Sequence, residues 1–173
     1  MVLYVDFDGV ILDTIPVLYD ELDKSNIPLN EDLRIREFFS LLDWQKIVDE
    51  TPQINDSIEC IKNVINANKY DVKVLTHVNS KQEEIAKTNY IHKFIPDLEV
   101  IAVPKTIKKN EYLKIINNSI LIDDFAGNLD EWTNAGGISV KFGTTTKESN
   151  YPKISRIDQV LDIDFSLNNK RIR

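Results

Sequence analysis

Val2-Leu3-Tyr4-Val5-Asp6-Phe7-Asp8-Gly9 is an apolar run that leads into two acidic residues and a glycine. The apolar part, residues 2–5, predicts a short buried strand. Asp6 and Asp8 are two residues apart, so an extended chain directs both side chains to one side. Two carboxylates at this spacing repel each other and favour a bound cation. Mg²⁺ is the expected ion, because it prefers oxygen ligands and usually binds one or two carboxylates together with substrate phosphate. The alternative is a strand that ends in an ordinary polar turn.

The composition predicts one globular domain with room for a small insert. The chain has 173 residues, of which 42% are apolar and 28% are charged, as in proteins with a hydrophobic core. The net charge of -7 disfavours a nucleic-acid polymer as partner, but it does not exclude a small phosphorylated substrate. Cys60 is the only cysteine, so we expect a packed side chain and no internal disulfide. The first apolar run is too short for a signal peptide or a membrane span, so we expect a cytoplasmic protein with no membrane partner.

Apolar runs and amphipathic helices alternate along most of the chain. After the first strand, we expect strands at residues 72–75, 98–103, 119–122 and 138–142. Helices are expected between them, and one of these begins at the capping box formed by Ser80 and Glu83. The expected buried positions of that helix are Ile85, Ile91 and Phe94. This alternation is typical of an α/β fold with a mostly parallel, five-stranded sheet and right-handed crossovers.

The segment between the first two strands is too long for a single crossover helix. We predict that residues 15–50 form a small helical cap, and that residues 1–14 and 51–173 form the core domain. The cap carries three aromatic side chains, Phe38, Phe39 and Trp44. They are candidates to stack on a substrate ring, and the alternative is that they hold the insert together.

Polar side chains follow three of the predicted strands. In chain order they are Asp6 and Asp8, Thr76 and His77, and Asp123 and Asp124. The carboxyl ends of parallel strands open onto one crevice, so these groups are expected to meet. The set suits phosphoryl transfer, in which one carboxylate attacks phosphorus and a second carboxyl moves the proton. Further carboxylates hold Mg²⁺, and a hydroxyl and a lysine bind the phosphoryl oxygens.

These segments resemble the motifs of the haloacid dehalogenase (HAD) superfamily, in its Mg²⁺-dependent phosphatase branch. Asp6-Phe7-Asp8-Gly9-Val10 is similar to the first motif, Val74-Leu75-Thr76 to the second, and Leu121-Ile122-Asp123-Asp124 to the fourth. The resemblance covers about residues 1–142 without the insert. It implies a three-layer Rossmann-like core, a Mg²⁺ cofactor and a helical cap that closes over a small molecule. Dehalogenases of the superfamily lack an acid at the position of Asp8, so the resemblance implies phosphate-ester hydrolysis.

The resemblance also implies a role for each acid. Asp6 would be the nucleophile and Asp8 the general acid and base. Mg²⁺ would be bound by Asp6, by the main-chain carbonyl of Asp8 and by Asp123, while Asp124 would support the metal or its waters.

Thr76, with His77 beside it, would bind phosphate. The third motif of the superfamily is a lysine, commonly at the start of the helix that leads to the fourth strand. Lys109 fits this position best, and Lys105 and Lys108 remain alternatives in that order.

The residues after the fourth strand resemble the 5'-nucleotidase and deoxyribonucleotidase group. The similar residues are Asp123-Asp124, Asn128-Leu129, Trp132 and Gly136-Gly137. A nucleoside or deoxynucleoside monophosphate is therefore the implied substrate. The alternatives are a phosphatase or phosphotransferase for another small phosphometabolite, and a non-catalytic phosphate-binding module. The sequence does not indicate the oligomeric state.

Overall fold

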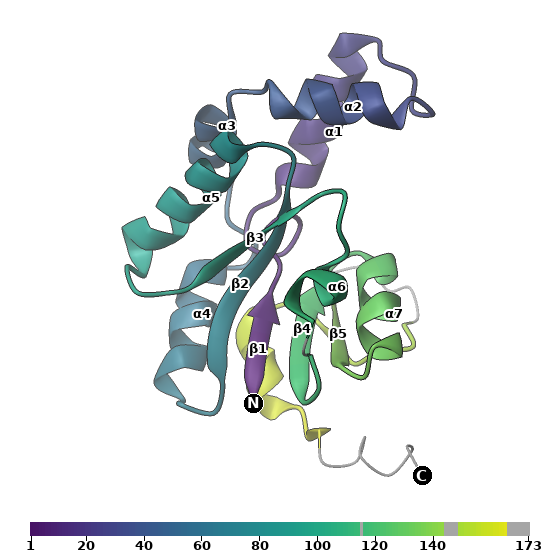
Figure 1. The fold of residues 1–173 in the computed structure, drawn as a ribbon. Coiled ribbons are helices and arrows are strands. Elements are labelled where there is room, and N and C mark those ends of the chain that lie inside the picture. Colours follow the sequence, from purple (N-terminus) through teal and green to yellow (C-terminus); the bar gives the residue numbers. More distant parts are fainter. Residues whose placement is uncertain (115, 144–148, 166–173) are drawn as a thin grey trace.

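The computed structural model describes residues 1–114, 116–143 and 149–165 (Figure 1). Residues 166–173, which the sequence analysis assigns to the core domain, lie outside the described residues. The strands are β1 (Val2–Val5), β2 (Asp71–Val78), β3 (Val100–Pro104), β4 (Ser119–Asp123), β5 (Ile138–Phe142) and β6 (Lys153–Ile154). The helices are α1 (Thr14–Ser25), α2 (Asp32–Ser40), α3 (Trp44–Glu50), α4 (Ser57–Asn66), α5 (Lys81–Phe94), α6 (Lys109–Leu113), α7 (Ala126–Asn134) and the 3₁₀ helix η1 (Ile157–Asp162). None of the helices in these ranges is both long and apolar enough to cross a membrane.

The strands form one six-stranded sheet in the order β3-β2-β1-β4-β5-β6. Every neighbouring pair is parallel, which confirms the predicted α/β class. The predicted count of five strands was wrong by one. β6 pairs with β5 through two residues only, Lys153 opposite Lys141 and Ile154 opposite Phe142. Two residues are too few for side-chain alternation to mark a strand in the sequence.

Apolar clusters cover both faces of the sheet. Leu3 and Val5 of β1 belong to the larger cluster, which includes residues of α3, α4, α5 and η1. Tyr4 belongs to the smaller cluster together with Leu129 and Trp132 of α7. Figure 1 accordingly shows α4 and α5 on one side of the sheet and α6 and α7 on the other. The alternation of side chains along β1 thus produces the three layers.

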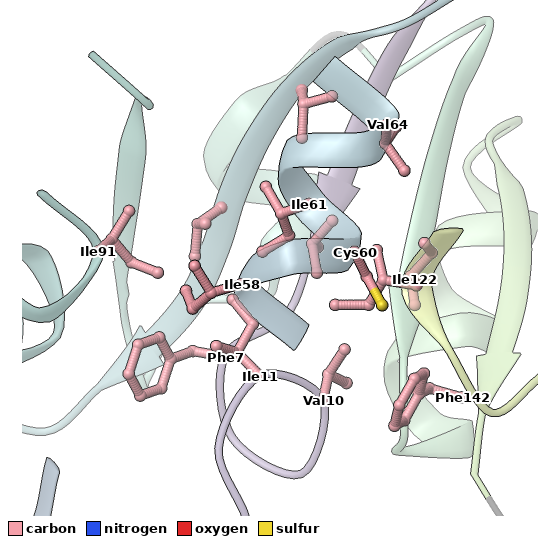
Figure 2. Packing of buried hydrophobic residues seen from close by; sticks show 14 of the residues in the cluster. Phe7, Val10, Ile11, Ile58, Cys60, Ile61, Val64, Ile91, Ile122 and Phe142 are labelled. Atoms are coloured by element: carbon pink, nitrogen blue, oxygen red, sulfur yellow. The ribbon is translucent and has the colours of Figure 1, made fainter. Parts of the chain in front are cut away.

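The larger cluster packs where α4 meets the sheet, as Figure 2 shows. Cys60 of α4 is fully buried in it, which confirms the expected packed cysteine. Phe7, Val10 and Ile11, which follow β1, are also fully buried. Each large apolar side chain buried this way contributes about 1.5–3 kcal/mol. The turn that carries Asp6 and Asp8 is therefore fixed to the core by the buried apolar side chains next to them in the sequence.

Three helices, α1, α2 and α3, occupy residues 14–50. α1 and α2 lie beyond the carboxyl ends of the strands (Figure 1). α2 has no buried residue, whereas Trp44, Ile47 and Val48 of α3 belong to the larger core cluster. α3 packs along α5. The outer part of the insert is therefore α1 with α2, and α3 attaches it to the core.

The buried face of α5 differs from the predicted one. Its buried residues are Glu83, Ala86, Lys87, Tyr90 and Ile91. Ile91 is buried as predicted, but Ile85 is 48% exposed, so that prediction was wrong. The helix turns two charged side chains into the protein, and a search for apolar periodicity does not find such a face.

Candidate active site

The three strands that carry the predicted acids and hydroxyl are neighbours in the middle of the sheet. Val5 of β1 is in register with Val74 of β2 and with Ile122 of β4. The main-chain nitrogen of Asp6 continues the ladder and donates to the carbonyl of Ile122 at 3.0 Å. Asp123 is the last residue of β4. The carboxyl ends of these strands therefore converge at one edge, as the sequence predicts for a parallel sheet.

Gly9 brings the turn after β1 against the end of β4. Its φ of +70° is a left-handed conformation, which glycine adopts without strain. A Cβ atom at this position would lie 2.4 Å from Oδ2 of Asp124. The turn is closed by the carbonyl of Phe7, which accepts from the nitrogen of Ile11 at 2.8 Å. The absence of a side chain at Gly9 therefore lets the Asp8 turn approach Asp124.

Asp6 is the most central of the acids. It is 7% exposed, and its Oδ1 accepts from the main-chain nitrogen of Phe7 at 2.8 Å. Its Oδ2 lies 2.8 Å from Nζ of Lys109. Burial raises the pKa of Asp6 well above its ordinary value, with Lys109 acting against this shift and the charges of Asp123 and Asp8 reinforcing it. The site thus concentrates negative charge around Asp6.

Asp123 is held by three donors. Its Oδ2 accepts from Lys109 at 2.7 Å and from the side chain of Asn128 at 2.8 Å, and its Oδ1 accepts from the nitrogen of Phe125 at 2.8 Å. Burial acts to raise the pKa of Asp123, but Lys109 and these hydrogen bonds outweigh it and lower the pKa below its ordinary value. Asp123 is therefore ionised at neutral pH.

Asp124 completes an acidic group that fits a divalent cation. Burial, followed by the charge of Asp123, raises the pKa of Asp124 to about 6. Asp6, Asp123 and Asp124 each offer one carboxylate oxygen, and these oxygens all lie within 4.8 Å of one another. Carboxylate oxygens are the ligands that Mg²⁺ prefers. Lys109 pairs with Asp6 and Asp123, and the charges of Lys141 and Lys109 only partly offset the shift at Asp124. The raised pKa values of Asp6 and Asp124 therefore mark a site where a bound cation would favour the ionised carboxylates.

The side chain of Asp8 is not part of this group. Its Oδ1 accepts from the hydroxyl of Thr14 at 2.8 Å, and its Oδ2 accepts from Lys87 at 2.5 Å. The metal contact that the resemblance implies for Asp8 goes through its main-chain carbonyl, and it stays a prediction. Asp8 also lines the cavity described below, so it faces the space above the acids.

Lys87 is a site residue that the local sequence patterns do not identify. It is fully buried, and Glu83 lies one helical turn before it, 2.6 Å from Nζ. Burial acts to lower the pKa of Lys87, but the carboxylates of Asp8 and Glu83 outweigh it and raise the pKa above its ordinary value. The available signal was the spacing of Glu83 and Lys87, which places both on the helix face that also carries Tyr90 and Ile91.

The two residues expected to bind phosphate differ in access. Thr76 is fully buried, and its hydroxyl accepts from Lys87 at 3.2 Å and donates to the carbonyl of His77 at 3.2 Å. His77 lines the cavity, and its Nε2 lies 3.0 Å from the carbonyl of Ile107. Burial, helped by the charges of Lys109 and Lys105, lowers the pKa of His77 to about 4. His77 is therefore neutral at pH 7, with Nε2 as the donor to the carbonyl.

The three candidate lysines lie in different places. Lys109 is buried between Asp6 and Asp123. Lys105 lines the cavity. Lys108 is exposed and pairs with Glu131 at 2.9 Å. The structure thus brings the first-ranked lysine to the acids.

A cavity of about 610 Å³ lies above the strand ends. On the core side it is lined by Asp6, Asp8, His77, Lys105, Asp124 and Phe125, among others. The insert contributes Ile15, Leu18, Tyr19, Ile35, Phe39 and Trp44, among others. Of the three cap aromatics, Phe38 does not line the cavity, but its ring packs beside that of Phe39 with 5.7 Å between centroids. Trp44 is 2% exposed, so it offers little surface to a ligand.

The fold is that of HAD-superfamily hydrolases. The sequence matches no known family profile and no curated protein. A HAD-superfamily hydrolase from Ehrlichia chaffeensis shares 15% identity over 93% of this chain and 94% of its own, with a TM-score of 0.55. D,D-heptose 1,7-bisphosphate phosphatase from B. bronchiseptica, complexed with magnesium and phosphate, shares 12% identity over 98% and 99%, with a TM-score of 0.57. A β-phosphoglucomutase from Clostridium difficile shares 16% over 98% and 95%, also with a TM-score of 0.57. At these identities the likeness establishes the fold.

Proposed function

We propose that the protein is a Mg²⁺-dependent phosphomonoesterase that acts through an aspartyl-phosphate intermediate. The observation that carries the proposal is the position of Asp6. Its Oδ2 lies 2.8 Å from Lys109, and it faces a cavity that Asp8 and Asp124 also line. A buried carboxylate with an adjacent cation and further acids is the arrangement that nucleophilic attack on phosphorus needs.

In the first step, a carboxylate oxygen of Asp6 attacks phosphorus and forms an acyl-phosphate bond. The bond from phosphorus to the ester oxygen breaks, and Asp8 gives that oxygen a proton so that an alcohol leaves. In the second step, Asp8 takes a proton from water as the water oxygen attacks phosphorus. Inorganic phosphate leaves and the Asp6 carboxylate is restored. Lys109 provides positive charge beside Asp6 throughout, where negative charge gathers on the phosphoryl group.

Mg²⁺ would be held by carboxylate oxygens of Asp6 and Asp123 and by the main-chain carbonyl of Asp8, with Asp124 supporting it. When bound, the ion neutralises phosphoryl charge and orients the phosphate. The neighbouring heptose bisphosphatase, complexed with magnesium and phosphate, and the neighbouring phosphoglucomutase support a phosphoryl-transfer chemistry on this fold.

A nucleoside or deoxynucleoside monophosphate is the substrate that we propose. The support comes from the cavity, whose volume of about 610 Å³ and lining by Tyr19, Phe39 and Phe125 suit a phosphate that carries a flat ring. The resemblance through Trp132 and the two glycines adds little. Trp132 is fully buried, and a Cβ at Gly137 would lie 2.3 Å from its ring, so packing accounts for these two residues. Gly136 has a φ of +92°, which favours glycine at the end of α7.

The direct test is a phosphate-release screen over nucleoside monophosphates, sugar phosphates and amino-acid phosphates, with Mg²⁺ and with a chelator. We expect turnover that needs Mg²⁺, is highest on nucleotides and ends in inorganic phosphate. Asp6→Asn should reduce the rate by at least about 10³-fold while the circular dichroism spectrum stays unchanged. Wild-type turnover by Asp6→Asn would overturn the mechanism. Transfer of phosphate to an added sugar phosphate, in place of release, would indicate a phosphotransferase.

A further inference from the structure

The ammonium group of Lys87 is the centre of a buried network beside the candidate active site. Nζ lies 2.5 Å from Oδ2 of Asp8, 2.6 Å from Oε1 of Glu83, 3.0 Å from the carbonyl of His77 and 3.2 Å from the hydroxyl of Thr76. An ammonium group has three N–H donors, so each of them has an acceptor in this network.

Glu83, on the same helix as Lys87, fixes the direction of the lysine side chain. One carboxylate oxygen of Glu83 accepts from Lys87, and the other accepts from the main-chain nitrogen of Asn79 at 2.7 Å and from its side chain at 3.1 Å. The hydroxyl of Ser80 caps the same helix and accepts from the nitrogen of Glu83 at 3.2 Å. Glu83 cannot turn away without breaking these bonds, so the direction of the Lys87 side chain is set by α5 and the loop before it.

Two aromatic rings flank the ammonium group. Nζ lies 5.4 Å from the centroid of the Phe7 ring and 5.0 Å from that of Trp44. Such rings attract a cation and keep water from it. Trp44 belongs to the insert, and its indole nitrogen donates to the carbonyl of Phe39 at 2.7 Å. The position of Lys87 is therefore fixed by the core and by the insert together.

The contact between Lys87 and Asp8 is the feature that an ordinary buried ion pair would not have. Buried pairs are costly to assemble, and Glu83 alone could neutralise Lys87. Asp8, however, keeps 19% of its side chain exposed and lines the cavity. Its second oxygen accepts from Thr14 at 2.8 Å. Both oxygens of Asp8 thus have a donor, and together Lys87 and Thr14 define the plane of a carboxyl group that faces the cavity.

We propose that Lys87, supported by Glu83, is a positioning residue for phosphoryl transfer that fixes the carboxyl group of Asp8 next to the reacting phosphate. This inference rests on the proposed function, in which Asp8 moves the proton in both steps. Lys87 acts through Asp8 and touches neither the substrate nor Asp6. Because the same ammonium also contacts Thr76 of β2, it links the turn after β1 to β2.

The proposal has a kinetic signature that a purely structural role lacks. Without Lys87, Asp8 loses one of its two fixed contacts, and both of its proton transfers become slower. A good leaving group such as p-nitrophenolate needs no proton in the first step, so this step stays fast and turnover is limited by the second step. The phosphoenzyme therefore accumulates, and p-nitrophenyl phosphate gives a burst of product. An alkyl ester needs the proton in the first step and gives no burst.

The experiment compares Lys87→Met and Glu83→Gln with wild type, on p-nitrophenyl phosphate and on a nucleoside 5'-monophosphate with Mg²⁺. For Lys87→Met we expect kcat on the nucleotide to fall by about 10²-fold, with KM within about threefold of wild type. On p-nitrophenyl phosphate we expect a smaller fall and a burst close to one equivalent per enzyme. Glu83→Gln keeps the lysine, so its kcat on the nucleotide should lie between those of wild type and Lys87→Met. Lys81→Met is the matched control, because Lys81 forms an exposed pair with Glu84 on the same helix, and it should behave as wild type.

Equal losses of kcat on both substrates without a burst, or no loss, would overturn the positioning role while leaving the phosphatase assignment intact. Absence of turnover by wild type itself would overturn both. Lys87→Met leaves Glu83 without its positively charged partner, so the double variant Glu83→Gln with Lys87→Met removes both charges and serves if the single variant does not fold. It should show the same burst and the same difference between substrates.

Discussion

The ammonium group of Lys109 lies 2.8 Å from Oδ2 of Asp6, which places a positive charge directly on the candidate nucleophile. The same group lies 2.7 Å from Oδ2 of Asp123. Burial acts to lower the pKa of Lys109, but these two carboxylates outweigh it and raise the pKa above its ordinary value. Lys109 therefore stays charged at neutral pH and links the ends of β1 and β4.

Lys109→Met should abolish most of the phosphatase activity. It removes the cation beside Asp6, and loss of one preorganised charge of this kind lowers kcat by about 10²–10³-fold. Lys108→Met is the matched control, because Lys108 is the preceding residue but is exposed and pairs with Glu131. The measurement is the steady-state kcat of the two variants and of wild type. Comparable losses in the two would assign the third-motif role to neither lysine.

Asp124→Asn should weaken Mg²⁺ binding more than it changes the fold. Asp124 supplies one of three carboxylate oxygens that lie within 4.8 Å of one another. Loss of a supporting ligand typically costs 10–100-fold in metal affinity, so we expect the half-saturating Mg²⁺ concentration to rise by about 10-fold or more. The rise in melting temperature on addition of Mg²⁺ should shrink in parallel. Asp97→Asn, an exposed acid before β3, should keep the wild-type values.

His77 should make the fold less stable in acid. Its pKa is lowered from 6.5 to about 4 in the folded protein, so the unfolded chain takes up the proton first. The contribution of neutral His77 to the free energy of unfolding is fully present above pH 6.5. It is lost as the pH falls toward 4, by roughly 3 kcal/mol at most. Asp6 and Asp124, whose pKa values are raised, act in the opposite direction. The measurement is therefore the difference in unfolding free energy between wild type and His77→Gln, from urea titrations between pH 4 and 7. This difference should fall as the pH falls, and a constant difference would contradict the assignment.

Phe39 and Phe38 provide a matched pair for the substrate proposal. Phe39 lines the cavity and Phe38 does not, although their rings pack together. If a nucleobase stacks on Phe39, Phe39→Ala should raise KM for a nucleoside monophosphate by about 10-fold, as stacking is worth about 1–3 kcal/mol. KM for p-nitrophenyl phosphate should change less. Phe38→Ala should have the smaller effect on the nucleotide, and equal effects of the two variants would argue against stacking on Phe39.

Much of the core could be predicted from local patterns. The run from Val2 to Val5 predicts a buried strand, and alternation of strands and helices predicts a parallel sheet. The rule that such strands end at one edge then brings Asp6 together with Asp123. The two-residue strand β6 escaped prediction, because it is defined by hydrogen bonds to β5 and not by its own periodicity. Helical spacing predicts that Ile85 is buried, because apolar residues usually form the inner face of a helix. In α5 the buried face carries Glu83 and Lys87, which pair with each other inside the protein, and Ile85 is exposed.

The sequence by itself determined the acids at the strand ends, the glycine that brings them together, and the order of the elements around them. These features are local, because they depend on side-chain alternation over a few residues and on the backbone freedom of Gly9. Only the tertiary structure decided which lysine reaches Asp6, that Thr76 is buried, and that Lys87 contacts Asp8 across 79 positions of sequence. A charged side chain enters the interior only where opposite charges from distant segments meet it, and that meeting is a property of the packed fold.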